Sequence, residues 1–208
     1  MSQALKSFDL SSELLESEQE YSHLRMSGTF LGASPVSNVQ ISDSTLEKAD
    51  LSATKLPKLR AIDSTVTQSS LVGTNLSESS LNATTFTNCR LTGTIFSNAL
   101  LDGCTFKDCA INMGLFRFSS LKKVKFIGCN LQSSDFFEAK LKEVSFEACN
   151  LEQADFSRVI GTKVDFRKSN IGSIRGISGL KGAIISSDQL ISLAQSLAYE
   201  IGIIVQDD

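Results

Sequence analysis

The chain has 208 residues, of which 41% are hydrophobic and 21% are charged, and its formal net charge is −3. These values exclude a disordered or collagen-like chain, and the charge is too small to indicate a nucleic-acid or membrane-surface binder. The single histidine excludes His-pair metal sites and argues against triad catalysis. We find no catalytic, cofactor-binding or metal-ligating motif and predict a protein that is not an enzyme.

The N-terminal segment is acidic and has no apolar stretch of the kind found in secretory signals. No segment of the chain reaches the ~18 apolar residues of a membrane span. We therefore expect a cytoplasmic protein with reduced cysteines and no membrane contact. Residues 12–16 could begin a short helix or remain disordered, and we assign residues 1–25 as an N-terminal acidic segment that caps the rod described next.

A five-residue period runs from residue 31 to residue 171 without interruption. Every fifth position holds Leu, Ile, Val or Phe in 27 of 29 cases, beginning at Leu31, and the exceptions are Ala61 and Gly161. The position two residues before each of these is small in 28 of 29 cases, with Leu59 as the exception. None of these positions is charged, which indicates that both classes are buried.

This period matches neither the 3.6 residues of a helix nor the 2 residues of a strand. It requires a chain that turns a corner every five residues, so that four sides close a square coil of 20 residues. Stacked coils bury the repeated positions and pair their backbones along the axis. We therefore predict an all-β solenoid over residues 26–175.

A rhythm of the form A(D/N)LXX appears in the segments 49–51, 149–151 and 154–156. It resembles the pentapeptide-repeat family, which implies a right-handed quadrilateral parallel β-helix. Twenty-nine repeats make about seven coils, and the rod would be about 34 Å long at ~4.8 Å per coil. The family includes dimeric quinolone-resistance rods that mimic duplex DNA, so the resemblance implies a type II topoisomerase such as DNA gyrase as a partner.

The apolar centres alternate between Phe and Leu or Ile from residue 81 to residue 156. A 20-residue coil then places the phenylalanines in two opposite stacks: Phe86, Phe106, Phe126, Phe146 and Phe166, and Phe96, Phe116, Phe136 and Phe156. The five cysteines all occupy the small inward position: Cys89, Cys104, Cys109, Cys129 and Cys149. A straight column of thiols suits neither a tetrahedral metal site nor a disulfide, so we interpret them as buried packing residues and predict no metal and no cofactor.

Residues 176–208 break the period and form a C-terminal cap or dimerisation segment. Ser186 and Gln189 have the spacing of a capping box, which predicts a short C-terminal α-helix that ends near Gly202. Residues 203–205 could form a short strand. The apolar residues of the helix either cover the last coil or join two copies in a homodimer, as similar tails do in gyrase-binding relatives: Leu190, Leu193, Ala194, Leu197, Ala198 and Ile201.

Two surface features stand out when the outward positions are sorted by side. Apolar residues gather on the side of Phe96 and Phe116 and form a candidate partner patch, with packing against a loop as the alternative: Ile95, Leu100, Leu115, Phe118 and Phe137. The next side carries a candidate basic stripe, opposed only by Asp102 and Glu143, with a solvated face as the alternative: Lys122, Lys123, Lys140, Lys142 and Lys163.

Three functions fit these features. The leading hypothesis is a non-enzymatic protein-interaction scaffold whose patch binds an unknown protein. The second is a DNA-mimicking topoisomerase modulator, although residues 31–175 carry 17 − 14 = +3 charges and a DNA mimic needs an acidic rod. The third is binding of a nucleic acid or polyanion on the lysines, which is weakest because no exposed aromatics alternate with them.

Overall fold

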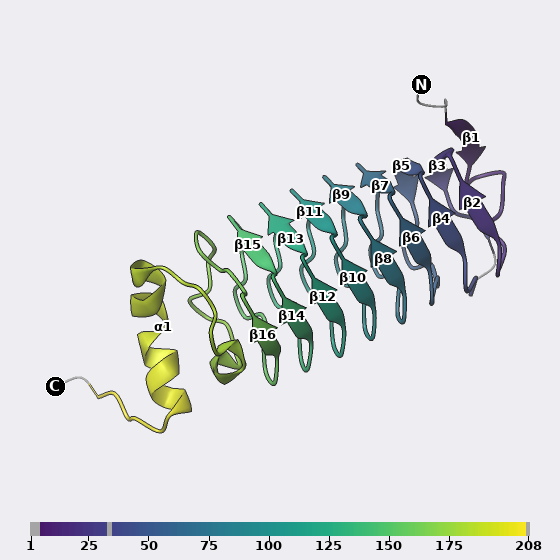
Figure 1. Cartoon of the computed structure of the whole chain (residues 1–208). Coiled ribbons are helices and arrows are strands. Elements are labelled where there is room, and N and C mark those ends of the chain that lie inside the picture. Colours follow the sequence, from purple (N-terminus) through teal and green to yellow (C-terminus); the bar gives the residue numbers. More distant parts are fainter. Residues whose placement is uncertain (1–4, 33–34, 207–208) are drawn as a thin grey trace.

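The protein is a rod of stacked coils, as the computed structural model shows for residues 5–32 and 35–206 (Figure 1). Two parallel eight-stranded sheets run along it, and each strand pairs with its counterparts one coil earlier and one coil later. The odd-strand side consists of β1 (Lys6–Asp9), β3 (Leu24–Thr29), β5 (Thr45–Asp50), β7 (Thr65–Thr67), β9 (Thr85–Thr87), β11 (Thr105–Lys107), β13 (Lys125–Ile127) and β15 (Ser145–Glu147).

The second sheet forms the neighbouring even-strand side of the rod. It consists of β2 (Glu20–Ser22), β4 (Gln40–Ser42), β6 (Arg60–Ile62), β8 (Ser80–Asn82), β10 (Leu100–Asp102), β12 (Ser120–Lys122), β14 (Lys140–Lys142) and β16 (Ile160–Thr162). The other two sides are joined by isolated parallel bridges, such as that between Ile95 and Leu115. The predicted parallel β-solenoid is therefore confirmed.

The 20-residue coil follows from the strand register, which pairs Phe106 with Phe86 and with Phe126. From residue 36 to residue 159, every repeat centre and every residue two positions before it is buried. The predicted inward positions are confirmed over this range. Because the chain turns a corner in each repeat, a residue with positive φ recurs at the corners, and many of these residues are not glycine.

Stacked phenylalanine rings fill the C-terminal half of the core. Rings in the same column lie 4.7–5.0 Å apart at angles of 3–10°. Rings from the two columns meet edge to face across the core, for example Phe116 and Phe126 at 6.0 Å and 87°. Both arrangements are favourable for aromatic quadrupoles, so each ring has favourable ring contacts within its column and across the core.

Aliphatic side chains replace these rings in the N-terminal half. Leu46 and Val66 precede Phe86 in one column, and Leu76 lies in the position one coil before Phe96. These smaller side chains leave an entirely apolar cavity of about 40 Å³ among them. The core is therefore less completely filled at the N-terminal end than at the C-terminal end.

The coils begin earlier than the sequence pattern indicates. β1 pairs with β3 and β2 with β4, and Leu10 and Leu15 are buried in the core. Residues 12–16 lie in turns and irregular structure, so the expectation of a helix or of disorder there is wrong. Backbone pairing extends the sheets without the pentapeptide signature, and each sheet has eight strands, which makes about eight turns rather than seven.

A shift of register corrects the assignment of Leu31 as an inward residue. The pairing of β3 with β5 slips by one residue between Met26 and Gly28, so Phe30 is buried in its place and Leu31 is 67% exposed. Val36 is again inward. Ala61 and Gly161 keep the regular register with Ile41 and Leu141.

The C-terminal end holds a 3₁₀-helix, η1 (Ile177–Leu180), and one α-helix, α1 (Ser187–Glu200). α1 lies across the end of the rod (Figure 1). Its capping box of Ser186 and Gln189 is formed as predicted. Residues 203–205 follow α1 as an exposed segment outside any strand, so the suggested strand is wrong. In the described part of the chain, no helix is long and apolar enough to span a membrane.

Candidate protein-interaction surface

The five residues of the predicted partner patch lie on one side of the rod and its corner. Ile95 and Leu115 are paired on neighbouring coils and are half-buried. Leu100 is 58% exposed at the start of β10, just beyond the corner, and Phe118 is 50% exposed. Phe137 lies one coil farther along and packs edge-on against Phe118, at 5.9 Å between centroids and 89° between planes. We call these five residues the aromatic patch.

Phe118 has an unusual backbone for its side chain. Its φ is 59°, in the left-handed region, where a bulky side chain is unfavourable. The residues at the same corner on neighbouring coils have the same conformation and are Asn98, Glu138 and Arg158. Phe118 is the one Phe or Tyr with positive φ in the described chain. It therefore bears backbone strain while half of its surface stays in water.

Two arginines lie against the ring of Phe137. The guanidinium carbons of Arg117 and Arg158 are 5.2 Å and 5.5 Å from its centroid, within the range of a cation–π contact. Arg117 also pairs with Asp135 at 2.7 Å, and Arg158 pairs with Glu138 at 3.1 Å. These contacts hold both arginines and the ring in place, so Phe137 is a rigid part of the surface.

Asp155 on this side has a lowered pKa. Burial raises the pKa of Asp155, but hydrogen bonds from Ser157 and the charges of Arg175 and Arg117 outweigh this effect and hold the pKa below its usual value. The backbone N–H of Ser157 donates to Asp155 at 2.8 Å, and that of Phe137 donates to Asp135 at 2.9 Å. The acidic residues here thus support the turns and neutralise the arginines.

The predicted basic stripe lies on the adjoining even-strand side. Lys122 and Lys142 are register partners, and Lys140 begins the same strand as Lys142. Lys122 donates to Asp102 at 2.7 Å, and this hydrogen bond raises the pKa of Lys122. Lys123 and Lys163 are exposed at the neighbouring corner. We call Lys122, Lys123, Lys140, Lys142 and Lys163 the lysine stripe.

The structure divides the six apolar residues of the C-terminal helix between two faces. Leu193 is buried and Leu197 half-buried against the end of the rod. A second face points away from it, with Leu190 at 52% exposure and Ile191 at 75%. Ala194 and Ile201 are also exposed, and Ala198 is half-buried. With 3.6 residues per turn, these residues form one continuous apolar stripe beside the docked face: Leu190, Ile191, Ala194, Ala198 and Ile201.

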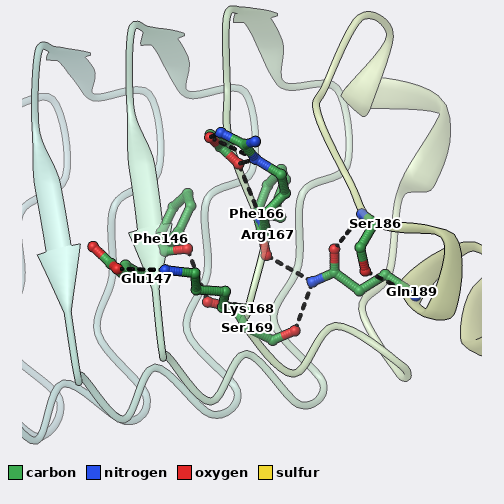
Figure 2. A network of polar contacts seen from close by, with 9 residues as sticks. Phe146, Glu147, Phe166, Arg167, Lys168, Ser169, Ser186 and Gln189 are labelled. Carbon is green, nitrogen blue, oxygen red and sulfur yellow. Dashed lines mark hydrogen bonds and ion pairs between the residues drawn. The ribbon is translucent and has the colours of Figure 1, made fainter.

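Gln189 fixes this helix to the last coil. Its amide nitrogen donates to the carbonyls of Phe166 and Ser169, both at 2.7 Å, and its amide oxygen accepts from the backbone of Ser186 at 2.8 Å (Figure 2). One coil earlier, the Ser169 hydroxyl donates to the Phe146 carbonyl at the same sequence separation of 23 residues. Gln189 thus occupies the next position of the inward column and provides hydrogen bonds for two backbone carbonyls of the last coil.

All five cysteines are free and buried. Four of the thiols donate to backbone carbonyls of the preceding coil, as Cys129 does to Phe106 at 3.3 Å, and Cys149 donates to Glu147 in its own coil at 3.4 Å. Burial raises the pKa of Cys104 to about 11, which keeps this thiol protonated at neutral pH. Within residues 5–32 and 35–206, no cluster of three His, Cys, Asp or Glu residues could hold a metal ion.

Arg117, Arg158, Met113 and Ile191 belong to these surfaces but were missed by the sequence analysis. Met113 is 60% exposed at the other edge of the patch side. The two arginines could have been found by comparing outward positions that are spaced 20 residues apart. Arg117 lies 20 residues before Phe137, and Arg158 lies 20 residues after Glu138. Ile191 lies beside the predicted apolar face of the helix, and it was not included because only one apolar face was predicted.

The stacked 20-residue coils and their outward-facing side chains define the class of protein: a repeat protein of the solenoid type. A family model described as the pentapeptide repeat region matches residues 39–116 and 104–175, more than half of the 208-residue chain. The chain belongs to the pentapeptide-repeat family, as the sequence resemblance implied. No curated protein matches it.

Solved structures of pentapeptide-repeat proteins are similar to this chain. HetL, involved in heterocyst differentiation regulation in the cyanobacterium Nostoc sp. strain PCC 7120, is 16% identical with a TM-score of 0.39, covering 85% of this chain and 93% of HetL. Full-length QnrB1, a plasmid-mediated fluoroquinolone resistance protein, is 19% identical with a TM-score of 0.34, covering 96% of this chain and 98% of QnrB1. A thylakoid lumen protein of Arabidopsis thaliana is 20% identical with a TM-score of 0.33, covering 51% and 74%.

Proposed function

We propose that the protein is a non-enzymatic scaffold that binds a protein partner through the aromatic patch. The observation that carries this proposal is Phe118. An aromatic ring at a left-handed corner loses backbone stability, and its half-exposed position recovers little of it through burial. Since Asn98 occupies the same corner one coil earlier, the fold itself has no need for a ring at this position. A partner that covers the ring supplies the missing burial.

The neighbouring residues suit such contact. Phe137 is held by two arginines and an edge-on ring, so little side-chain freedom is lost when a partner binds. Aromatic and arginine side chains contribute most to protein–protein affinity when they lie near the centre of a contact. Leu100 and Met113 extend the apolar surface to both edges of this side.

Crosslinking from position 118 identifies the partner. A benzoylphenylalanine at this position, irradiated in cells that express the protein, should attach the partner, while the same group at Lys107 on the odd-strand side should not. The attached protein is then purified, and its affinity is measured for the wild type and for Phe118→Asn.

We expect Phe118→Asn to weaken this binding by about tenfold or more, or about 1.4 kcal/mol. The same variant should unfold at the same or a higher temperature, because Asn tolerates the left-handed conformation. Phe118→Asp should also fold, whereas Phe126→Asp should abolish folding because it buries a charge in the core. Unchanged binding by Phe118→Asn would refute the proposal.

A DNA-gyrase supercoiling assay tests directly whether a topoisomerase is the partner. Inhibition, or protection from fluoroquinolone-stabilised cleavage, that persists in Phe118→Asn would assign the function to another surface of the rod. Loss of the effect in that variant would identify gyrase as the protein that covers the patch.

We also propose that the exposed stripe on α1 joins two copies of the chain in a homodimer. Within the stripe, Ile191 is 75% exposed and Ile201 is 73% exposed, and Ile204, just beyond the stripe, is 84% exposed. The docked face of the helix uses other residues, so covering the stripe would leave the attachment of α1 to the rod intact. Two rods joined at this end would present two aromatic patches on one assembly.

A further inference from the structure

The aromatic patch and the lysine stripe share one corner of the rod. The first outward residues of β10, β12, β14 and β16 form a column in register: Leu100, Ser120, Lys140 and Ile160. Leu100 is 58% exposed and Ile160 is 65% exposed, and Phe118 lies two residues before Ser120 on the same corner. Lys140 is therefore next to the exposed Ile160 on one side and is separated from Leu100 on the other side by Ser120 alone, so the two surfaces are continuous.

The positive charge is unbalanced on only one side of this corner. On the patch side, Arg117, Arg158 and Arg175 pair with Asp135, Glu138 and Asp155. On the lysine side, among the residues that the structure describes, four lysines of the stripe form no ion pair within 4.0 Å: Lys123, Lys140, Lys142 and Lys163. A ligand at the corner thus meets apolar side chains next to free ammonium groups.

The same corner is hollowed in the preceding coils. A surface groove of about 610 Å³ runs along it and reaches Leu100, and it is lined by Glu18, Gln19, Glu20, Asn38, Gln40, Lys58, Arg60, Glu78 and Ser80. Its glutamates offset its two basic side chains, so the carboxylates of an acidic ligand belong at the lysine stripe and not in the groove. Its lining includes five successive members of one column, so the groove extends about 19 Å along the axis: Glu20, Gln40, Arg60, Ser80 and Leu100. An elongated ligand fits such a groove better than a compact one.

We propose that this corner binds an acidic amphipathic segment of another protein, extended along the rod axis. Apolar side chains of the segment contact Leu100, Phe118 and Ile160, and its carboxylates meet Lys140 and Lys142. A nucleic acid is disfavoured because Ile160, next to Lys140, offers nothing to a phosphate backbone, and because the single exposed ring of Phe118 does not form a row of rings alternating with the lysines. This inference rests on the proposed scaffold function and names the chemistry of the partner.

A peptide selection tests the proposal without knowledge of the natural partner. Random peptides of about 12 residues, which span about 40 Å when extended, are displayed on phage and selected on the purified full chain. The selected peptides are synthesised with fluorescein, and their dissociation constants are measured by anisotropy. We expect those that bind to combine Asp or Glu with Leu, Ile or Phe.

Variants then locate the binding. The pair Lys140→Glu and Lys142→Glu should weaken it by about tenfold or more, and so should the pair Leu100→Ser and Ile160→Ser. The control pair Lys107→Glu and Lys125→Glu makes the same charge change on β11 and β13 and should leave affinity within about twofold. Binding to the wild type should also weaken as salt is added.

The outcomes separate this inference from the proposed function. Peptides that need Phe118 but are indifferent to Lys140→Glu and Lys142→Glu would overturn the acidic segment and leave the scaffold intact. Peptides that need the lysines but bind Phe118→Asn equally well would remove the aromatic patch from both proposals. Displacement of the peptides by a labelled single-stranded DNA at lower concentration would replace the acidic segment with a nucleic acid, and so would overturn the inference.

Discussion

Single residues decide how well the core is filled. Leu76 borders the apolar cavity and lies one coil before Phe96 in the same column. We expect Leu76→Phe to extend the ring stack into the cavity and to raise the unfolding free energy by about 1 kcal/mol. Thermal or urea unfolding measures the change. Leu121→Phe is the control, since Leu121 is buried outside the cavity lining, and overpacking there should destabilise by about 1–3 kcal/mol.

Asp165 provides a test of pH dependence at the scale of one residue. Hydrogen bonds from Arg167, which contacts both carboxylate oxygens, hold the pKa of Asp165 below its usual value. A folded-state pKa below the unfolded one gives stability that is present above about pH 4 and is lost as the pH falls through the folded value.

We therefore compare Asp165→Asn with the wild type in urea at about pH 6 and about pH 3. Asn keeps the oxygen that accepts from the backbone of Arg167 at 3.0 Å, and the variant removes the charge together with the Oδ2 acceptor of the Arg167 guanidinium. The wild type should be more stable at the higher pH, and the difference should shrink at the lower pH. A difference that grows on acidification would contradict this account.

Much of the residue-scale pattern could be predicted from the sequence, because a square coil repeats one environment every five residues. The inward positions, the two phenylalanine columns and the outward position of Phe118 follow from that period. Leu31 did not, because a slip in β3 changes the register without changing the local composition. The contacts of Arg117 and Arg158 with the ring of Phe137 were not predicted either, because they join residues on three successive coils.

At the scale of elements, the C-terminal helix acts as a substitute for one more coil. Gln189 donates two hydrogen bonds of 2.7 Å to carbonyls that the next coil would otherwise satisfy. The capping box was readable from Ser186 and Gln189, but this second role was not, because it depends on Gln189 falling 20 residues after Ser169. It also could not be predicted from the sequence which of the two adjacent apolar faces of α1 packs against the end of the rod.

Gln189→Leu should leave the Ser169 carbonyl without a donor and the Phe166 carbonyl with only the backbone N–H of Ser169 at 3.1 Å, and it should cost about 1–3 kcal/mol of unfolding free energy. Gln189→Glu should cost more at neutral pH, because a carboxylate cannot donate and faces two carbonyl oxygens. Gln195→Leu, at an exposed position of the same helix, should cost less than about 0.5 kcal/mol. Protease cleavage within α1, followed alongside urea unfolding, shows whether the helix has left the rod; equal effects of the Gln189 and Gln195 changes would contradict the capping role.

At the scale of the whole molecule, the proposed homodimer makes a prediction about mass. A chain of 22.5 kDa should have twice that mass in solution by light scattering. Ile191→Glu should restore the single-chain mass because a charge in the apolar stripe opposes its burial. Ser192→Glu, at an exposed position of the same helix about 150° away from the middle of the stripe, adds the same charge outside the stripe and should leave the dimer intact.

Peptide binding by the aromatic patch should be unaffected in the Ile191→Glu monomer, since the patch lies several coils away from α1. A single-chain mass for the wild type at all concentrations would refute the dimer without affecting the scaffold. The N-terminal extension of the rod belongs to this scale too: residues 6–22 carry no repeat signature, and their place in the sheets depends on backbone pairing and on the burial of Leu10 and Leu15.

The apolar cavity has a consequence for how the rod comes apart. Each coil contacts only the coils on either side, so the molecule unfolds as a row of neighbours rather than as one body. The ring-filled coils near Phe146 are anchored by Gln189, while those near Val66 enclose empty space. Under tension or during hydrogen exchange, the N-terminal coils should therefore open first and the C-terminal coils last. The resistance of the coils to opening thus increases from the N-terminal to the C-terminal end of the rod, and the aromatic patch lies in the more resistant part.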